Sequence, residues 1–457
     1  MQYVSTRGGT VPASFGQAVM MGLAEDGGLL VPDRIPRFHN ELPRLSRLSY
    51  PQLALELMSP FVDDVPREDL EELLERSYGP AFGEPVARLV ELGAVSVLEL
   101  FHGPTLAFKD VALQFLGNLF EYLLGRENQH LNVLVATSGD TGSAAIYGLR
   151  GRERINVFVM HPRGRISGLQ ERQMTTVLDG NVFNLAIEGS FDDCQQILKA
   201  LSANLEFKRR VGLGAVNSVN WARVLAQLVY YFWAYLRSGA ERIQFSVPTG
   251  NFGNILAGWY AWRMGLPIER LVLGTNDNDI LARFYQTGVY ARGSVRHTLA
   301  PAMDIQVASN FERYLYHRLD GDPQALRRAM DTFRAAGELR LGQADPIFRA
   351  AACDRRQILS TIRRFHEEHG YLLDPHTAVG VAAGLENALP EIPLVCVGTA
   401  HPAKFPRAIQ EAIGKDLARH PRLDVLADLP TRLEVLDNDP RAVARFIEIA
   451  VGLPAGA

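Results

Sequence analysis

The sequence predicts an α/β protein in which parallel sheets are flanked by helices, with an extra domain at the N-terminus. From about residue 95 onward, short apolar runs alternate with helical patterns, an order typical of βαβ units and a parallel sheet. Several turns from an apolar run into a helix are rich in glycine and hydroxyl residues. Ligands of open α/β sheets bind at the carboxyl ends of strands, so these turns are the first candidates for a site.

Residues 1–95 are expected to form a separate, mostly helical and loop-like N-terminal domain. Asp26-Gly27-Gly28 predicts a turn that leads into a short strand at 29–31. Apolar residues at helical spacing predict helices at 50–58 and 68–76. A chain of 457 residues has room for two or three domains of about 150 residues each.

The remaining elements divide into two α/β domains, at 96–240 and 241–457. Strands are expected at 97–101, 131–136, 155–160, 182–187, 243–247, 271–274 and 393–397. Helices are expected at 108–124, 143–149, 169–178, 192–201, 228–236, 253–264, 310–316, 326–335, 377–385 and 403–413.

Composition excludes several classes of protein. The net charge of −4 argues against a nucleic-acid binder, which needs a basic surface. The three cysteines are far apart, which supports neither a metal site nor a disulfide framework and favours a reducing compartment. The first residues do not resemble a signal peptide, and the apolar run at 228–236 is shorter than the about 20 residues that span a bilayer. We therefore expect a cytoplasmic protein with no membrane partner and no obligatory protein partner.

The first candidate turn is 138–142, with the sequence Ser-Gly-Asp-Thr-Gly. Its glycines let the backbone approach a ligand, and the hydroxyls and N–H groups at a helix start suit a carboxylate. An ordinary capped helix start is the alternative, because Ser, Thr and Asp are preferred caps. Asp140-Thr141-Gly142 also resembles an aspartic-protease signature, but that chemistry needs two carboxylates and the chain has no second such motif.

The second candidate turn is Gly250-Asn251-Phe252-Gly253-Asn254, which separates an expected strand from an expected helix. Glycines and backbone N–H groups at a helix start can hold a phosphate without a cation. The turn is neither a Walker loop nor a dinucleotide fingerprint, since both have a different spacing. An ordinary glycine-rich turn remains the alternative.

Lys109 and Thr399 are two further candidate ligand-binding residues. Lys109 lies among apolar residues, and desolvation lowers a lysine pKa from about 10.4 and frees the amine as a nucleophile for a Schiff base. Thr399 follows an expected strand and could offer a hydroxyl, although each residue alone could be structural. Together with 250–254 and 138–142, they match the aldehyde, phosphate and ring nitrogen of pyridoxal phosphate and the carboxylate of a substrate.

These residues resemble threonine synthase of the longer bacterial and fungal type, over nearly the whole chain. The segments that carry the resemblance are STRG (5–8), EDGGLLVP (25–32), HGPTLAFKD (102–110), TSGDTGSAA (137–145), GRISGLQERQMTT (164–176), PTGNFGN (248–254), PAMDIQVASNFER (301–313) and TAHPAKF (399–405). The resemblance implies the pyridoxal-phosphate fold type II of the tryptophan synthase β-subunit. It also implies a reaction in which O-phospho-L-homoserine and water become L-threonine and phosphate.

The resemblance assigns roles to individual residues. Lys109 would bond to the cofactor, Gly250, Asn251, Phe252, Gly253 and Asn254 would hold its phosphate, and Thr399 would meet the pyridine nitrogen. Ser138, Asp140 and Thr141 would contact the substrate carboxylate and the region of the cofactor 3′-oxygen. Asp140 stands where many relatives in the wider fold carry asparagine, and aspartate is usual in this type of threonine synthase.

The leaving phosphate of the substrate needs cationic and hydrogen-bonding partners. Arg163, Arg165 and Ser167 follow an expected strand end, and Lys404 follows Thr399 closely. Each is a candidate for this role, with a surface charge or polar residue as the alternative. His102 precedes the lysine loop and is a candidate for proton transfer or for a structural histidine.

Three alternative functions stay open at this stage. Another enzyme of the same fold, such as threonine dehydratase or cysteine synthase, is disfavoured by Asp140, by the segment at 160–167 and by the N-terminal domain. A related phospholyase would release phosphate and a keto acid instead of threonine. A non-catalytic homologue that keeps the cofactor is disfavoured by the intact lysine, cup and hydroxyl turn.

Overall fold

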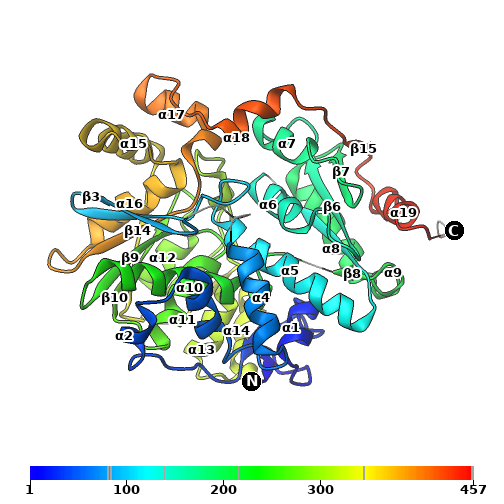
Figure 1. Cartoon of the computed structure of the whole chain (residues 1–457), viewed down its shortest axis with the longest axis horizontal. Helices are drawn as coiled ribbons and strands as arrows, with labels where there is room; N and C mark the ends of the chain where they lie inside the picture. The colour runs from blue at the N-terminus through cyan, green and yellow to red at the C-terminus, as the bar shows by residue number, and fades with distance from the viewer. Residues whose placement is uncertain (80–81, 83–84, 138, 215, 343–344, 454–457) are drawn as a thin grey trace. The chain divides into compact units, whose positions relative to one another are not determined.

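The computed structural model of the chain describes residues 1–79, 82, 85–137, 139–214, 216–342 and 345–453. The chain divides into two compact units (Figure 1). Unit 1 comprises 1–19, 23–112 and 218–419, and unit 2 comprises 20–22, 113–217 and 420–457. The domain boundaries expected at 95 and 240 were placed where the pattern of apolar residues changes along the sequence, whereas these units are defined by contacts in space. Those boundaries therefore stay a prediction.

Unit 1 is built on a six-stranded sheet in the order β13-β10-β9-β14-β4-β3. All neighbouring strands are parallel except the edge pair β3 and β4, which is antiparallel. The strands are β3 (Arg88–Leu92), β4 (Val95–Glu99), β9 (Ile243–Pro248), β10 (Ile268–Thr275), β13 (Phe348–Ala352) and β14 (Leu394–Gly398). In Figure 1, β9, β10 and β14 lie side by side, and the carboxyl ends of β9 and β14 lead into two of the predicted site segments.

Helices cover both faces of this sheet. Gly258 of α11 (Gly253–Arg263) packs closely against Leu271, and Gly274 packs against Val379 of α16 (Pro375–Asn387). Residues 271 and 274 point to opposite faces because side chains alternate along a strand, so α11 and α16 lie on opposite faces. The aromatic-rich α10 (Trp221–Ser238) packs on α11, and α15 (Arg355–His369) packs on α16.

The other elements of unit 1 surround this frame. In the N-terminal segment, β1 and β2 pair antiparallel, and α3 packs on α4. The bounds are β1 (Tyr3–Ser5), α1 (Phe15–Met21), β2 (Leu30–Pro32), α2 (Leu42–Leu45), α3 (Tyr50–Met58), α4 (Arg67–Tyr78), α12 (Ile280–Thr287), β11 (Val289–Ala291), η1 (Pro301–Met303), α13 (Phe311–Arg318), α14 (Pro323–Ala336), β12 (Glu338–Arg340), η2 (Pro402–Lys404) and α17 (Pro406–Ile413).

Unit 2 is built on a five-stranded, all-parallel sheet in the order β15-β7-β6-β5-β8. Its core joins these strands to apolar residues of α8 and α19. The bounds are α5 (Lys109–Glu127), β5 (Leu131–Ala136), α6 (Asp140–Leu149), β6 (Ile155–Pro162), α7 (Gly168–Thr175), β7 (Val182–Ile187), α8 (Phe191–Ala203), α9 (Leu205–Val211), β8 (Leu213–Gly214), α18 (Pro421–Asp424), η3 (Val425–Asp428), β15 (Glu434–Leu436) and α19 (Pro440–Ala450). Helix α5 begins in unit 1 and continues into unit 2 from Leu113.

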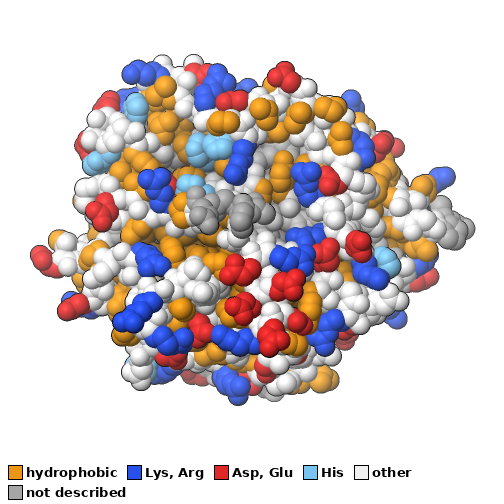
Figure 2. Space-filling view, viewed as in Figure 1, with side chains coloured by type: hydrophobic (Ala, Val, Ile, Leu, Met, Phe, Trp, Pro, Cys, Tyr) orange, Lys and Arg blue, Asp and Glu red, His pale blue; other side chains and the backbone are white. Residues whose placement is uncertain are grey.

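The predicted fold class is confirmed, but several elements were not expected, including β1, β13, β15 and α19. The N-terminal 95 residues, expected as mostly helical and loop-like with one short strand, also contribute β3, which is partly exposed and lacks a strict alternation of buried and exposed side chains. Helix α15 was not expected, because charged residues outnumber the apolar residues that it buries. None of the described helices is both long enough and apolar enough to cross a bilayer. Basic and acidic side chains are interspersed over the face shown in Figure 2.

Candidate active site

Lys109 is the first residue of α5, and the loop that precedes it is joined by its backbone to the loop that carries Thr399. Its side chain is half-buried, with Nζ 5.5 Å from the centre of the Phe108 ring. The loop at 100–108 pairs with the loop at 398–401, and Ala107 and Ala400 form an antiparallel bridge. Three backbone hydrogen bonds join the loops: Leu100 N–H to the Gly398 carbonyl at 3.0 Å, Phe108 N–H to Thr399 at 2.9 Å, and His401 N–H to Leu106 at 3.0 Å.

A buried polar cluster lies beneath the lysine loop. Asp110 accepts hydrogen bonds from Thr105 N–H at 2.8 Å and Thr105 Oγ1 at 2.6 Å, and Lys404 Nζ donates to the Thr105 carbonyl at 2.8 Å. Burial raises the pKa of Asp110 to about 6, against the opposing effects of the Thr105 hydrogen bonds and the Lys404 charge. Lys404 is only 2% exposed, so the alternative of a surface charge is wrong for this residue. The contacts give Lys404 a structural role, and its contact with the substrate phosphate stays a prediction.

His102 is held by Glu99, a residue that sequence reasoning missed. Glu99 ends β4, and its two carboxylate oxygens contact His102 Nε2 at 3.0 Å and Tyr371 Oη at 2.7 Å. Burial alone would raise the pKa of Glu99, but the hydrogen bonds from His102 and Tyr371 outweigh burial and hold the pKa below its ordinary value. An imidazole paired with a carboxylate is oriented for proton transfer, so this contact favours the functional interpretation of His102.

The 250–254 turn forms a cup at the start of α11. Phe252 has a left-handed backbone with φ of 64°, and its buried ring packs against Phe311 and Tyr314. A Cβ atom at Gly250 would lie 2.7 Å from the Ala302 carbonyl oxygen, so only glycine fits there without a shift. Because the first N–H groups of a helix lack partners within the helix, the start of α11 presents donors to an anion.

Asn254 supplies the most specific sign that an anion belongs in the cup. Its Oδ1 accepts hydrogen bonds from Tyr230 at 2.6 Å and Tyr231 at 2.8 Å. Its buried Nδ2 has no hydrogen-bond partner among the described residues. A buried donor without an acceptor is costly, so a bound phosphate oxygen would satisfy it. The side chain of Asn251 is engaged differently, because its Oδ1 accepts from Ser309 Oγ at 3.1 Å. The cup therefore fits a phosphate group.

The first candidate turn lies in unit 2, between β5 and α6. Ser138 lies outside the described residues. Thr137 Oγ1 accepts hydrogen bonds from the N–H groups of Gly139 at 3.0 Å and Gly142 at 2.9 Å, which fixes the turn. Asp140 is buried, Thr141 is half-buried, and both lie in the first turn of α6. The turn thus has the hydroxyl and helix-start N–H groups that suit a carboxylate.

Gln170 is a second residue that sequence reasoning missed. Its Nε2 donates to Asp140 Oδ1 at 3.2 Å, and a Cβ atom at Gly139 would lie only 2.5 Å from the Gln170 side chain. Ser167 caps α7 by accepting from Gln170 N–H at 3.2 Å, and its hydroxyl also donates to Gln170 Oε1 at 3.1 Å. Ser167 therefore orients the side chain that holds Asp140, and its contact with substrate stays a prediction.

The two arginines after β6 are both exposed in the structure. Arg163 forms an ion pair with Glu188, and its side chain is 57% exposed. This contact supports the alternative that Arg163 is a surface charge, since a substrate phosphate would have to compete with Glu188. Hydrogen bonds from Ser190 are the main cause that lowers the pKa of Asp193. The charge of Arg165 lowers the same pKa by a smaller amount. The phosphate-binding roles of both arginines stay predictions.

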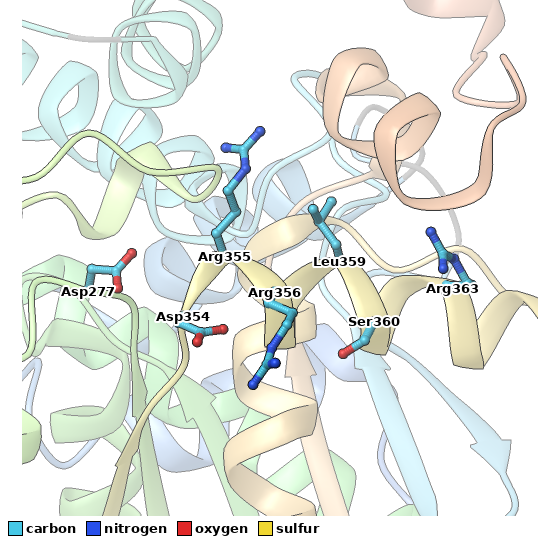
Figure 3. Close-up of a pocket in the computed structure, with 7 residues that line it drawn as sticks. All are labelled: Asp277, Asp354, Arg355, Arg356, Leu359, Ser360 and Arg363. Atoms are coloured by element: carbon cyan, nitrogen blue, oxygen red, sulfur yellow. The ribbon is translucent and has the colours of Figure 1, made fainter.

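A surface pocket of about 540 Å³ lies at the start of α15 in unit 1 (Figure 3). Arg355 there is paired with Glu411, and Arg363 donates to the Ala412 carbonyl at 2.7 Å. The pocket contains none of the predicted site residues and is lined by Asp277, Asp354, Arg355, Arg356, Leu359, Ser360 and Arg363. Within the described ranges, no three His, Cys, Asp or Glu side chains are grouped to hold a metal ion.

Comparison with known proteins covers nearly the whole chain. Three family models match: "Threonine synthase N terminus" at residues 2–78, "Pyridoxal-phosphate dependent enzyme" at 84–399 and "Threonine synthase, C-terminal" at 377–447. A threonine synthase of Pseudomonas aeruginosa is 45% identical, with 98% of each chain covered, and one of Eremothecium gossypii is 46% identical, with 97% covered. The crystal structure of a PLP-bound threonine synthase from Brucella melitensis superposes with a TM-score of 0.95 at 42% identity, over 99% of each chain.

Proposed function

The chain belongs to the threonine synthase family of pyridoxal-phosphate-dependent enzymes, and we propose that it converts O-phospho-L-homoserine and water into L-threonine and phosphate. One observation carries this proposal for the chain's own residues. The backbone pairing of 100–108 with 398–401 joins the loop that precedes Lys109 to Thr399, the two residues that would meet the cofactor at its aldehyde and at its pyridine nitrogen. Asn254 lies in the cup, and its buried Nδ2 has no hydrogen-bond partner among the described residues. This donor supports a phosphate ligand in the cup.

Pyridoxal phosphate, when bound, supplies an electron sink that stabilises negative charge on substrate carbon atoms. Lys109 would hold the cofactor covalently, the start of α11 with Asn254 would bind its phosphate, and Thr399 would hydrogen-bond to its ring nitrogen. The cup has helix-start N–H groups and an amide, which suits tight binding of a phosphate that never reacts.

Proton transfer is assigned to Lys109. Its amine would take one proton from the α-carbon and one from the β-carbon of the substrate before the phosphate leaves. It would then return one proton to the γ-carbon and, after water has added at the β-carbon, one to the α-carbon. General base catalysis needs an amine held within hydrogen-bond reach of the carbon, and the paired loops restrict where this amine can lie. His102, oriented by Glu99, is a second candidate for moving a proton.

Substrate binding is assigned to the turn in unit 2. The N–H groups at the start of α6 and the Thr141 hydroxyl would bind the substrate carboxylate. The negative charge of Asp140 would repel a substrate carboxylate placed close to it. The hydrogen bond from Gln170 holds Asp140 Oδ1 in a fixed position. Arg163, Arg165, Ser167 and Lys404 remain candidates for the leaving phosphate, and the ion pair of Arg163 makes it the weakest of the four.

The test is to incubate the purified chain with pyridoxal phosphate and O-phospho-L-homoserine, and to measure phosphate, threonine and keto acid together. We expect equal amounts of phosphate and threonine. Phosphate with a keto acid would instead establish the phospholyase alternative, and no turnover of this substrate would overturn the proposal. Lys109→Ala should lose at least about a thousandfold in turnover if the lysine is both cofactor anchor and base. The matched control is Lys199→Ala, at an exposed lysine of α8, which should keep wild-type turnover.

A further inference from the structure

We propose that Asp374, His376 and Thr377 are positioning residues. They hold the two ends of the cofactor site, Thr399 and the cup at Gly250, in fixed positions relative to each other. This inference rests on the proposed function, because it concerns how the site for pyridoxal phosphate is held. The three residues lie in the segment Asp374-Pro375-His376-Thr377, where α16 begins on one face of the unit 1 sheet. They do not belong to the predicted site, and all three are buried.

Asp374 is the centre of the arrangement. It is the N-cap of α16, and it accepts backbone hydrogen bonds from His376 N–H at 2.9 Å and Thr377 N–H at 3.2 Å. Its carboxylate also accepts from His376 Nδ1 at 2.9 Å and from the Thr377 hydroxyl. A helix cap accounts for the two backbone contacts only. The two side-chain contacts fix the directions of an imidazole and a hydroxyl, which a cap alone does not require.

The first arm runs from Thr377 to Thr399. The single hydroxyl proton of Thr377 is donated to Asp374, which leaves its oxygen lone pairs as acceptors. Thr377 Oγ1 accepts a hydrogen bond from the Thr399 backbone N–H at 3.2 Å. Because the Thr399 carbonyl also accepts from Phe108 N–H at 2.9 Å, both peptide groups that flank the Thr399 side chain are fixed. The hydroxyl proposed to meet the pyridine nitrogen therefore stands on a backbone held from both sides.

The second arm runs from His376 to the cup. Its Nε2 accepts a hydrogen bond from Ala302 N–H at 3.2 Å, so the ring proton lies on Nδ1, which faces Asp374. The ring also packs edge-on against Phe405, with the ring centres 5.0 Å apart. Ala302 is the residue whose carbonyl oxygen would lie 2.7 Å from a Cβ atom at Gly250. His376 thus fixes the peptide segment against which the cup backbone packs.

The two arms meet at one carboxylate, so a change at Asp374 should loosen both the ring-nitrogen end and the phosphate end of the site. A helix cap that is merely structural predicts something else: a loss of stability with no specific effect on the cofactor. Asp322 is a matched control, because it is also an aspartate N-cap followed by proline and accepts from Gln324 N–H at 2.8 Å and Ala325 N–H at 3.1 Å. Its carboxylate accepts these hydrogen bonds from backbone groups of its own helix, as an ordinary cap does.

The experiment measures the Kd of pyridoxal phosphate for cofactor-stripped full-length variants, together with the absorbance band of the bound cofactor and the melting temperature. Asp374→Ser keeps a capping hydroxyl for the backbone N–H groups but loses the carboxylate that accepts from the side chains of His376 and Thr377, whereas Asp322→Ser makes the same change at the control helix. We expect Asp374→Ser to raise the Kd at least about tenfold, the size that the loss of one or two buried hydrogen bonds predicts, and to shift the absorbance band. Asp322→Ser should leave both unchanged.

A second pair of variants guards against a simple failure to fold. Thr377→Val keeps the shape of the side chain and removes the hydroxyl, and Thr377→Ser keeps the hydroxyl. We expect Thr377→Val to raise the Kd several-fold and to shift the band, with Thr377→Ser within about twofold of the wild type. A wild-type Kd and band in Thr377→Val would overturn the proposal, as would equal effects of Asp322→Ser and Asp374→Ser. A wild-type chain that binds no pyridoxal phosphate would overturn the proposed function itself.

Discussion

Replacing Gly250 with alanine adds one methyl group at the floor of the cup. The new Cβ atom would lie 2.7 Å from the Ala302 carbonyl oxygen and 3.3 Å from Met303 Cα. Both neighbours are backbone atoms, so no flexible side chain can move aside. Ordinary contact begins at 3.4 Å, which means that the Ala302 carbonyl must retreat by about 0.7 Å. The same peptide segment is held by His376 through the Ala302 N–H, so the retreat also strains that hydrogen bond.

The expected cost follows from this overlap. Overpacking by one methyl group in a tightly packed region costs about 1–3 kcal/mol. If the strain is felt when the cup closes on a phosphate, the Kd for pyridoxal phosphate rises roughly 5- to 150-fold. The assay titrates cofactor-stripped Gly250→Ala with pyridoxal phosphate and follows the absorbance of the bound form.

The control is Gly180→Ala, because a Cβ atom there meets nothing within 4 Å and the φ angle is not positive. This variant should bind the cofactor as the wild type does. A Gly250→Ala variant with the wild-type Kd would refute the reasoning that the cup at 250–254 binds the cofactor phosphate, since a displaced cup cannot leave that contact unchanged.

Three further changes test other parts of the site. Asn254→Asp keeps an acceptor for the two tyrosines but puts a negative charge where Nδ2 lies, so the Kd for pyridoxal phosphate should rise at least about a hundredfold in an absorbance titration. Gln170→Leu removes the donor that holds Asp140, so KM for O-phospho-L-homoserine should rise several-fold in a phosphate-release assay while the cofactor Kd stays constant; a changed cofactor Kd with an unchanged KM would contradict the assignment. The pKa of Asp110 is raised to about 6 by burial, so the folded state holds a proton that the unfolded state loses near pH 4. The contribution of Asp110 to the unfolding free energy should therefore fall by about 2 kcal/mol as the pH rises from 4 to 7, measured as wild type minus Asp110→Asn in denaturant titrations; a flat difference would contradict this.

The strands at 131–136 and 182–187 were predicted with their bounds, because a mostly apolar run of six residues bounded by polar residues is a signal for a buried parallel strand. Helix α15 and strand β3 were not predicted. In α15 the buried Ile358, Ile362 and Phe365 do lie at helical spacing, a signal that was overlooked among the charged residues around it, whereas β3 is an edge strand without a fully buried face.

The residues of the candidate site also differ in whether local sequence patterns identify them. The glycine-rich turns and Lys109 are local patterns, so sequence could find them and propose their ligands. Glu99, Gln170 and Asp374 act through contacts with residues that local sequence does not identify. Lys404 shows the converse limit, since a lysine after a strand is usually exposed and here is buried against the Thr105 carbonyl.

The most direct test of the central claim asks which lysine carries the cofactor. The full-length chain is incubated with pyridoxal phosphate, reduced with borohydride, digested and analysed by mass spectrometry for a pyridoxyl group. We expect the group on the peptide that contains Lys109, and we expect no group on the corresponding peptide of Lys109→Ala. A pyridoxyl group confined to another lysine, such as Lys404, or absent from the chain altogether, would contradict this expectation.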